Sequence, residues 1–182
     1  MNKKMVWLLL AMCQASYADP TIDIETEYYT VRGSTPDDIR TDMNQKRQDD
    51  YDAYTKWHVK WYFETVRDDD FCELDQIDVI LDVKFILPQW QPGRHVSDEV
   101  ETLWDDYYTA LIEHENQHKD IAIEMAEEIE SALYELDGES SCKQLNKIAN
   151  AAANNILDEY KEAQKQFDAD TNHGMNEGAV FP

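Results

Sequence analysis

The apolar residues of this chain change their spacing once, and this change constrains the fold more than any other feature of the sequence. In the stretch 19–92 they recur at every second position, the period of a strand with one buried face, and the clearest runs are 56–63 and 77–87. In the stretch 97–167 they recur every three or four positions, the period of an amphipathic helix. Strands that precede helices, instead of alternating with them, predict an α+β fold with an N-terminal antiparallel β-sheet.

Three shorter features complete the predicted strand half. Residues 28–31 form a weaker strand candidate, and Thr35-Pro36 has the residue types that begin a helix leading to Ile39. The segment 87–93 contains two prolines and a glycine, so we expect it to be a connection.

The second half of the sequence predicts a long antiparallel helical hairpin. Ser97 is a suitable N-cap, because acidic residues that favour a helix N-terminus follow it directly. The apolar stripe continues to Leu136, breaks at 137–140, and is followed by a second stripe that ends at Phe167. Two helices joined by so short a break pack most simply side by side and antiparallel.

The charge of the chain excludes two classes of partner. It has 39 acidic against 16 basic residues, a net charge of -23. A surface this negative would repel phosphate backbones and anionic lipid headgroups, so we expect no nucleic-acid partner and no polybasic membrane anchor.

The first eighteen residues have the pattern of a secretory signal peptide. Two lysines precede a short apolar run, and Ser16-Tyr17-Ala18 supplies a cleavage site after Ala18. We therefore expect export to the periplasm or the exterior, with residues 19–182 as one domain. The apolar run is too short to span a bilayer, so we expect no stable membrane insertion after cleavage. A lipid anchor on Cys13 is the alternative, although Met12 stands where a small residue normally precedes a lipid-modified cysteine.

Two cysteines remain once this leader is removed. An even number of cysteines in an oxidising compartment predicts a disulfide between Cys72 and Cys142. The alternative, a pair of thiolate ligands to zinc, lacks the C-x-x-C spacing of a structural zinc site.

The segment His114-Glu115-Asn116-Gln117-His118 carries the pattern H-E-x-x-H within the first long helix. Histidines four residues apart lie on one face of a helix, so both imidazoles can reach one metal ion. They continue the buried stripe between Leu111 and Ile121, where imidazoles without partners would be costly. We expect His114 and His118 to bind Zn²⁺ and Glu115 to be the catalytic carboxylate. The alternative is two ordinary core histidines beside a surface glutamate.

A catalytic zinc site needs a third protein ligand and one open position. If the chain reverses near Glu139, His118 lies level with Tyr160 and His114 with Gln164. The segment after Phe167 then emerges near the metal, and it contains a third histidine, His173.

Two carboxylates compete with His173 for this role. Glu159 falls on the inward stripe of the second helix, where it can ligate the metal or accept a hydrogen bond from a ligating imidazole. Asp168 lies in the same C-terminal segment. We favour His173, because histidine is a preferred zinc ligand.

Several short blocks occur in a specific order and spacing through most of the mature chain: Tyr29-Thr30-Val31-Arg32-Gly33-Ser34-Thr35, Met43-Asn44, Thr55-Lys56-Trp57, Trp61, Cys72, Leu87-Pro88-Gln89-Trp90, His114-Glu115 with His118, Cys142, and Asp168 with Thr171, His173 and Gly174. In these blocks the chain resembles a bacterial family described as predicted secreted zinc-dependent proteases and catalogued as a domain of unknown function. The resemblance implies a zincin-like site, in which His173 matches a C-terminal T-x-H-G motif. Phe167 departs from the pattern, because similar sequences have tyrosine there.

The function expected from these residues is zinc-dependent hydrolysis of peptide bonds in a secreted or periplasmic protein. Zinc would activate water, Glu115 would act as general base, and a peptide or protein substrate would bind along an exposed sheet edge. Tyr160 and Arg94 are the candidates for stabilising the oxyanion.

Two other functions compete with proteolysis. In a non-catalytic zinc-binding module of the cell envelope, the metal would tie the hairpin to the C-terminal tail through a closed site, with Glu159 or Asp168 added to the three histidines. Alternatively, the acidic hairpin would bind a basic partner protein, although scattered charges of this kind ordinarily serve solubility.

Overall fold

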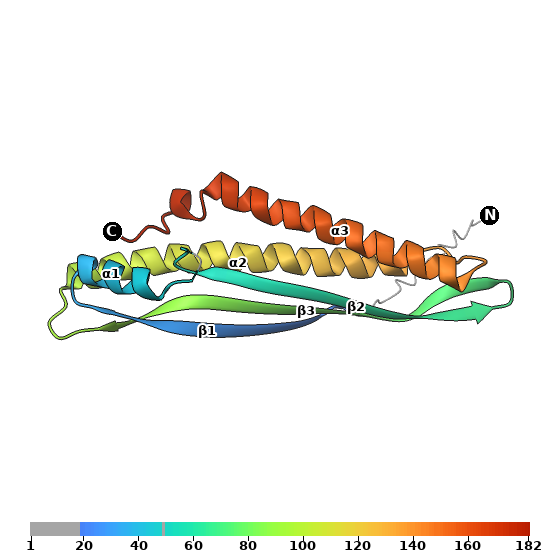
Figure 1. The fold of residues 1–182 in the computed structure, drawn as a ribbon, viewed down its shortest axis with the longest axis horizontal. Coiled ribbons are helices and arrows are strands. Elements are labelled where there is room, and N and C mark those ends of the chain that lie inside the picture. The colour runs from blue at the N-terminus through green and yellow to red at the C-terminus, as the bar shows by residue number, and fades with distance from the viewer. Residues whose placement is uncertain (1–18, 49) are drawn as a thin grey trace, which may run out of the picture.

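The computed structural model describes residues 19–48 and 50–182, so the expected signal peptide and Cys13 lie outside the described residues. The elements in chain order are β1 (Thr21–Gly33), α1 (Pro36–Lys46), β2 (Tyr54–Asp68), β3 (Phe71–Pro92), α2 (Asp98–Tyr134), α3 (Cys142–Thr171) and a single 3₁₀ turn, η1 (Met175–Glu177). A sheet followed by long helices confirms the predicted α+β fold (Figure 1).

The three strands form one sheet in the order β1-β3-β2. As predicted, β2 and β3 are antiparallel, with Val59 opposite Leu81. In contrast, β1 pairs with β3 in parallel, with Tyr28 opposite Leu87. The tight turn between β2 and β3 imposes an antiparallel pair. Strand β2 starts at the end of the sheet where β1 finishes and runs back along it, so β3, which turns again and lies between them, is parallel to β1.

The prediction of a connection at 87–93 was wrong, because β3 continues to Pro92. This end of β3 pairs with β1 as far as Gly33 opposite Pro92, whereas its pairing with β2 ends at Ile86. Beyond Ile86 β3 therefore has only one neighbouring strand. Proline lacks an N–H, and it is tolerated where one side of a strand needs no partner.

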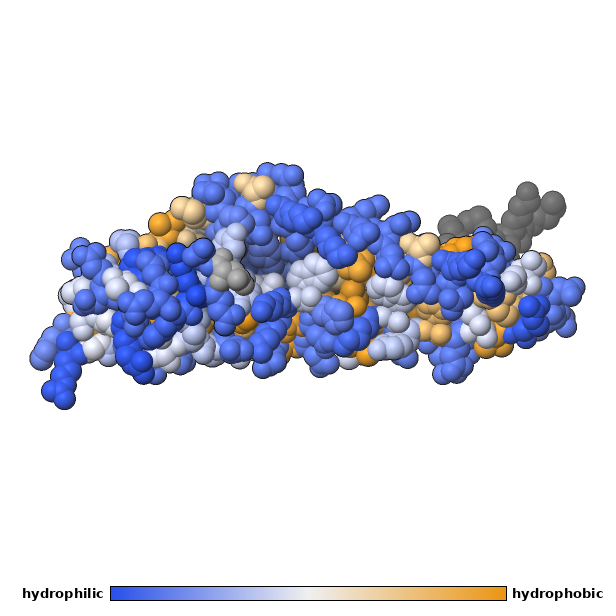
Figure 2. All heavy atoms as spheres, viewed as in Figure 1, coloured by the Kyte–Doolittle hydropathy of each residue, from blue (hydrophilic) through white to orange (hydrophobic). Residues whose placement is uncertain are grey.

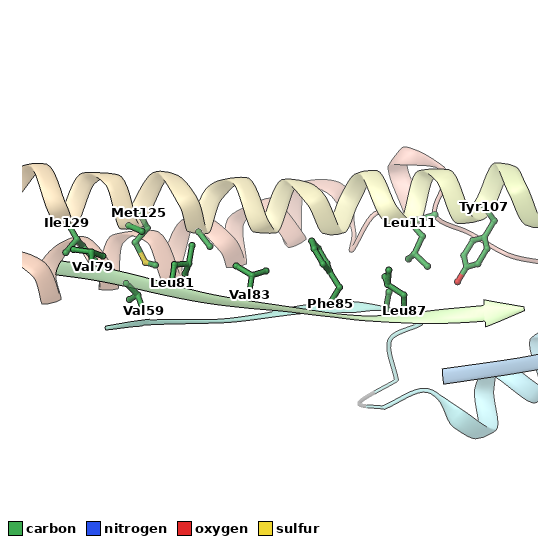
Figure 3. Close-up of a cluster of buried hydrophobic side chains, with 14 of the residues drawn as sticks. Val59, Val79, Leu81, Val83, Phe85, Leu87, Tyr107, Leu111, Met125 and Ile129 are labelled. Carbon is green, nitrogen blue, oxygen red and sulfur yellow. The ribbon is translucent and has the colours of Figure 1, made fainter. Parts of the chain in front are cut away.

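Both long helices lie on one face of the sheet, and α2 runs along its length (Figure 1). At 37 residues α2 is about 55 Å long, and β3 with 22 residues is about 70 Å long. The apolar faces of strands and helix therefore meet over many turns (Figure 3). Side chains labelled there include Val59, Val79, Leu81, Val83, Phe85 and Leu87 from the sheet, and Tyr107, Leu111, Met125 and Ile129 from α2.

The helix ends follow from capping residues that the sequence displays. Ser97 accepts a hydrogen bond from the Val100 N–H at the start of α2, and Thr35 and Ser141 cap α1 and α3 in the same way. Throughout residues 19–48 and 50–182, no helix combines the length and the apolar character needed to cross a membrane.

The predicted disulfide between Cys72 and Cys142 is present. The backbone of Cys72 also exchanges hydrogen bonds with Glu139, at 2.6 and 2.9 Å. These contacts join the start of β3 to the turn between α2 and α3. They therefore fix where the hairpin reverses, and the register of α3 against α2 follows from that point.

Candidate metal centre

The register of the two long helices decides which residues meet the H-E-x-x-H segment. In the structure His118 contacts Gln164 and His114 approaches Asp168, so the prediction that His118 lies level with Tyr160 was wrong by one helical turn. These two contacts pair positions that are symmetric about residue 141, whereas the prediction placed the centre near Glu139.

His114 and His118 bring their Nε2 atoms to 3.2 Å from each other. The Oδ1 atom of Asp168 lies 3.0 Å from Nε2 of His118 and 3.4 Å from Nε2 of His114. At a zinc–nitrogen distance near 2.0 Å, neighbouring ligand atoms of a tetrahedral site are about 3.3 Å apart. The three atoms are therefore spaced as ligands of one tetrahedral ion, and they are the group of the described residues whose ligand atoms are close enough to share a metal.

The other nitrogen of each imidazole already has a partner. Nδ1 of His114 lies 3.0 Å from Oε2 of Glu177, and Nδ1 of His118 contacts Oε1 of Gln164. The amide of Gln164 also donates from Nε2 to the backbone oxygen of His118 at 2.8 Å, which turns its oxygen toward the ring. Because both partners are oxygen acceptors, each Nδ1 donates to its partner, and each ring turns its Nε2 toward the other ring and toward Asp168.

The charges of this cluster are coupled. Burial on its own would lower the pKa of His114, but hydrogen bonds to Asp168 and Glu177 outweigh it, so the pKa is raised. The pKa of His118 is also raised, because Asp168 and Gln164 outweigh burial. Burial would raise the pKa of Asp168, yet the two imidazoles hold it well below its ordinary range. The cluster attracts protons when metal-free, and a bound cation would take their place.

Phe167 closes the apolar side of the cluster. Its ring stacks on His114 with centroids 4.8 Å apart and meets His118 edge-on at 4.9 Å. Since this residue has no hydroxyl, it offers packing here and no hydrogen-bond donor.

Glu115 lies beside the cluster and is 4% exposed. Its Oε2 accepts a hydrogen bond of 2.7 Å from Thr55 at the start of β2. Burial raises the pKa of Glu115, while the hydrogen bond from Thr55 opposes the rise. A buried carboxylate with a raised pKa and one fixed donor has the properties of a general base.

These side chains line a cleft of about 560 Å³. α3 draws away from α2 toward its C-terminal end (Figure 1), and the surface beneath this half of α3 is hollowed (Figure 2). The start of β2 and the C-terminal tail supply the other walls, and His114, Glu115, His118, Asp168 and His173 all face the cleft.

His173 lies next to the cluster of His114, His118 and Asp168 and is not one of its three members. Its Nδ1 is 3.3 Å from Oδ1 of Asp168, its side chain is 45% exposed, and its ring contacts Tyr51 at 4.8 Å. Within the described residues, the structure therefore brings two of the three predicted ligands together with Asp168 and places the third one contact away.

The other residues considered from the sequence lie elsewhere. Glu159 is exposed on α3 and faces away from the cleft, because the inward positions of α3 are taken by residues such as Ala153 and Gln164. Tyr160 donates a hydrogen bond to Glu128 at 2.8 Å, and Arg94 is exposed in a bend. Neither Tyr160 nor Arg94 is among the residues that line the cleft.

Sequence reasoning did not identify Glu177 or Thr55 as parts of the site. Thr55 comes from a strand distant in sequence, and Glu177 arrives only because the tail folds back on α2. The spacing of apolar residues does not mark such contacts, and the block Thr55-Lys56-Trp57 assigned no role to Thr55. Gln164, by contrast, precedes Asp168 by four residues, and this spacing places both side chains on one helix face.

A family model described as a bacterial protein of unknown function (DUF922) matches residues 26–174. The match includes the H-E-x-x-H segment, Asp168 and His173, and it ends before Glu177. No curated protein and no solved structure matches the chain.

Proposed function

The chain belongs to the family of bacterial proteins of unknown function DUF922, and we propose that it is a zinc metallopeptidase that hydrolyses peptide bonds. The observation that carries the proposal is the meeting of two Nε2 atoms from an H-E-x-x-H helix beside the buried carboxylate of Glu115, in one open cleft. The donor set fits zinc, because imidazole and carboxylate are ligands that this ion prefers.

The proposed ligands are His114, His118 and Asp168. A zinc ion held there supplies Lewis-acid chemistry, lowering the pKa of a water molecule and polarising a carbonyl oxygen. Glu115 accepts the proton of the attacking water and returns it to the leaving amine. Its raised pKa suits both transfers, and Thr55 holds the carboxylate in place.

His173 has two proposed roles that an experiment can separate. The sequence assigns it as the third zinc ligand. With Asp168 in that position, the exposed imidazole of His173 in the same cleft becomes the donor that stabilises negative charge on the substrate oxygen. This assignment fills the oxyanion role for which Tyr160 and Arg94 are out of place.

The substrate we propose is an extended peptide. Strand β2 is an edge of the sheet, because it pairs only with β3. The first residues of β2 lie along the cleft, so a peptide can pair with the free side of β2 as a further strand. Three of the exposed large apolar side chains, Tyr51, Met175 and Val180, also line this cleft. Such a rim favours peptides with apolar side chains near the scissile bond.

The test compares Glu115→Gln with His114→Ala in zinc content and in turnover of casein and a peptide library. We expect Glu115→Gln to retain zinc and lose hydrolysis, and His114→Ala to lose both. Glu113→Gln, which changes an exposed carboxylate on the same helix, is the matched control and keeps both. Full turnover by Glu115→Gln would sink the proposed mechanism.

One observation favours a second function, a zinc-binding envelope module without turnover. Nδ1 of His173 lies 3.3 Å from Oδ1 of Asp168, so His173 is the side chain that a closed site would add to the group of His114, His118 and Asp168. A site with four protein ligands leaves no open position for water. For this function the prediction is stoichiometric zinc, loss of zinc on replacing either Asp168 or His173, and no hydrolysis of any peptide.

A further inference from the structure

We infer that the C-terminal segment 175–181 is a built part of the metal centre, in which Glu177 is the positioning residue that fixes the ring of His114. The inference rests on the proposed zinc site. Glu177 lies outside the stretch 26–174 that the family model matches. The site of this chain therefore includes a residue beyond the H-E-x-x-H segment and His173.

The carboxylate of Glu177 is held against one face of α2. Its Oε2 accepts from Nδ1 of His114 at 3.0 Å, and its Oε1 lies 3.5 Å from Nε2 of Gln117. Gln117 follows His114 by three residues, so both contacts come from adjacent turns of the same helix. A carboxylate held at both oxygens has little freedom to turn away from the imidazole.

The backbone leading to Glu177 is shaped for close approach to α2. Gly174 has a φ of +76°, and a Cβ built on it would lie 3.0 Å from Cγ of His114. Gly178 has a φ of +98°. Both values fall in the left-handed region that favours glycine. The two glycines flank η1, so the turn that carries Glu177 can lie directly on the histidine.

Beyond η1 the tail is anchored in the core. Ala179 and Phe181 are buried, and the ring of Phe181 contacts Trp104 and Tyr107 with centroids 5.6 and 5.3 Å apart. Arg40 donates a hydrogen bond of 2.8 Å to the Phe181 carbonyl. These contacts come from α1 and α2, and they hold Glu177 in place from its C-terminal side.

Such a carboxylate acts on a metal through the imidazole. By accepting from Nδ1 it selects the tautomer whose Nε2 is unprotonated, fixes the plane of the ring and makes Nε2 a stronger donor to a metal. Gln164 does the same for His118 with a neutral amide. The two histidines are therefore oriented by different segments, one by the tail and one by α3.

The experiment measures the zinc dissociation constant of the full chain by competition with a chromophoric chelator. We expect Glu177→Ala to weaken zinc binding by about 10- to 100-fold. Glu177→Gln keeps an oxygen that can accept from Nδ1, so its loss is smaller. Glu159→Gln removes one exposed negative charge from α3 and is the matched control, with affinity unchanged. Thermal unfolding of the metal-free proteins separates orientation of the ligand from a general loss of stability.

Wild-type affinity in Glu177→Ala overturns the inference, and so does an equal loss in Glu177→Gln and Glu177→Ala. If Glu177→Ala is unfolded without metal, the comparison of Glu177→Gln with Glu159→Gln decides, and equal affinities there overturn it. A wild-type protein that binds no zinc overturns this inference and the proposed function together. A wild-type protein that binds zinc in a Glu177-dependent way but cleaves no peptide supports the inference and removes only the proposed peptidase.

Discussion

The Nε2 atoms of His114 and His118 face each other at 3.2 Å, while the Nδ1 atom of each ring is already bound to an oxygen acceptor. Two lone pairs at this distance, with the Asp168 carboxylate beside them, repel one another unless a cation lies between them. Either a proton on one imidazole or a bound metal ion removes this repulsion. The competition between protons and zinc for one site gives the first prediction.

We predict that the stabilisation of the fold by zinc increases with pH. In the metal-free protein the raised pKa values of His114 and His118 contribute stability that is complete below about pH 6.5 and is lost as pH rises through the raised values. The lowered pKa of Asp168 contributes stability that is present above about pH 4 and is lost as pH falls through the lowered value. The cluster thus favours the metal-free fold most between these limits, and zinc binds best above them.

The measurement is the melting temperature with zinc and with a chelator across this range of pH. The increment due to zinc should grow as the imidazoles lose their protons. His114→Ala should show no increment at any pH. An increment in the wild type that stays flat or falls with rising pH contradicts the prediction.

Replacing Asp168 or His173 should separate a zinc ligand from a group that stabilises charge. We expect Asp168→Asn to lose zinc and activity together, because its Oδ1 lies within 3.4 Å of both Nε2 atoms. We expect His173→Ala to keep zinc and to lose about 10²- to 10³-fold in kcat, the usual cost of removing an oxyanion donor. Zinc content by atomic absorption and kcat on one peptide are both needed. Loss of zinc from His173→Ala, with retention by Asp168→Asn, would establish His173 as the third ligand, as the sequence predicts.

Local patterns predicted the helices and the centre of the site, because they depend on residues near one another in sequence. The H-E-x-x-H spacing and the buried stripe placed His114 and His118 together, and the capping residues gave the helix starts. The hairpin was placed correctly, but its register was off by one turn. A shift of one turn changes which α3 residue meets His118, and of the two carboxylates considered as ligands it places Asp168 in the site and leaves Glu159 outside it.

Contacts between segments that are distant in the sequence could not be predicted from local patterns. The parallel pairing of β1 depends on how the chain returns after α1, which alternation of apolar residues cannot specify. Thr55 and Glu177 reach the site only through the packing of β2 and of the tail. The prolines after Leu87 led to the wrong prediction of a connection. A strand tolerates proline where it has a neighbour on one side only, and this depends on where the pairing with β2 stops, which no local signal gives.

Thr55→Val should shift the acid limb of the pH–activity profile to higher pH. The hydroxyl of Thr55 donates to Glu115 and favours its charged form, opposing the rise in pKa caused by burial. Without this donor the pKa of Glu115 rises further, so the base becomes protonated at a higher pH. The profile of kcat/KM against pH checks the shift. Thr65→Val, on the same strand and outside the cleft, is the control with an unchanged limb. An unshifted limb in Thr55→Val argues against Glu115 as the base.

Replacing both Cys72 and Cys142 by serine should cost stability without weakening zinc binding by the folded protein. The disulfide closes a loop with a sequence separation of 70, and loop-closure entropy gives about 4 kcal/mol of stabilisation for a loop of this size. Urea unfolding of the zinc-free protein measures the loss. Gln164, the α3 residue that contacts His118, lies about 33 Å along the helix from Cys142, so the metal centre is remote from the bridge. The zinc dissociation constant of the double variant, measured where it is folded, should match that of the wild type. A large loss of zinc affinity in the folded double variant would show instead that the disulfide is needed to hold α3 in register at the site.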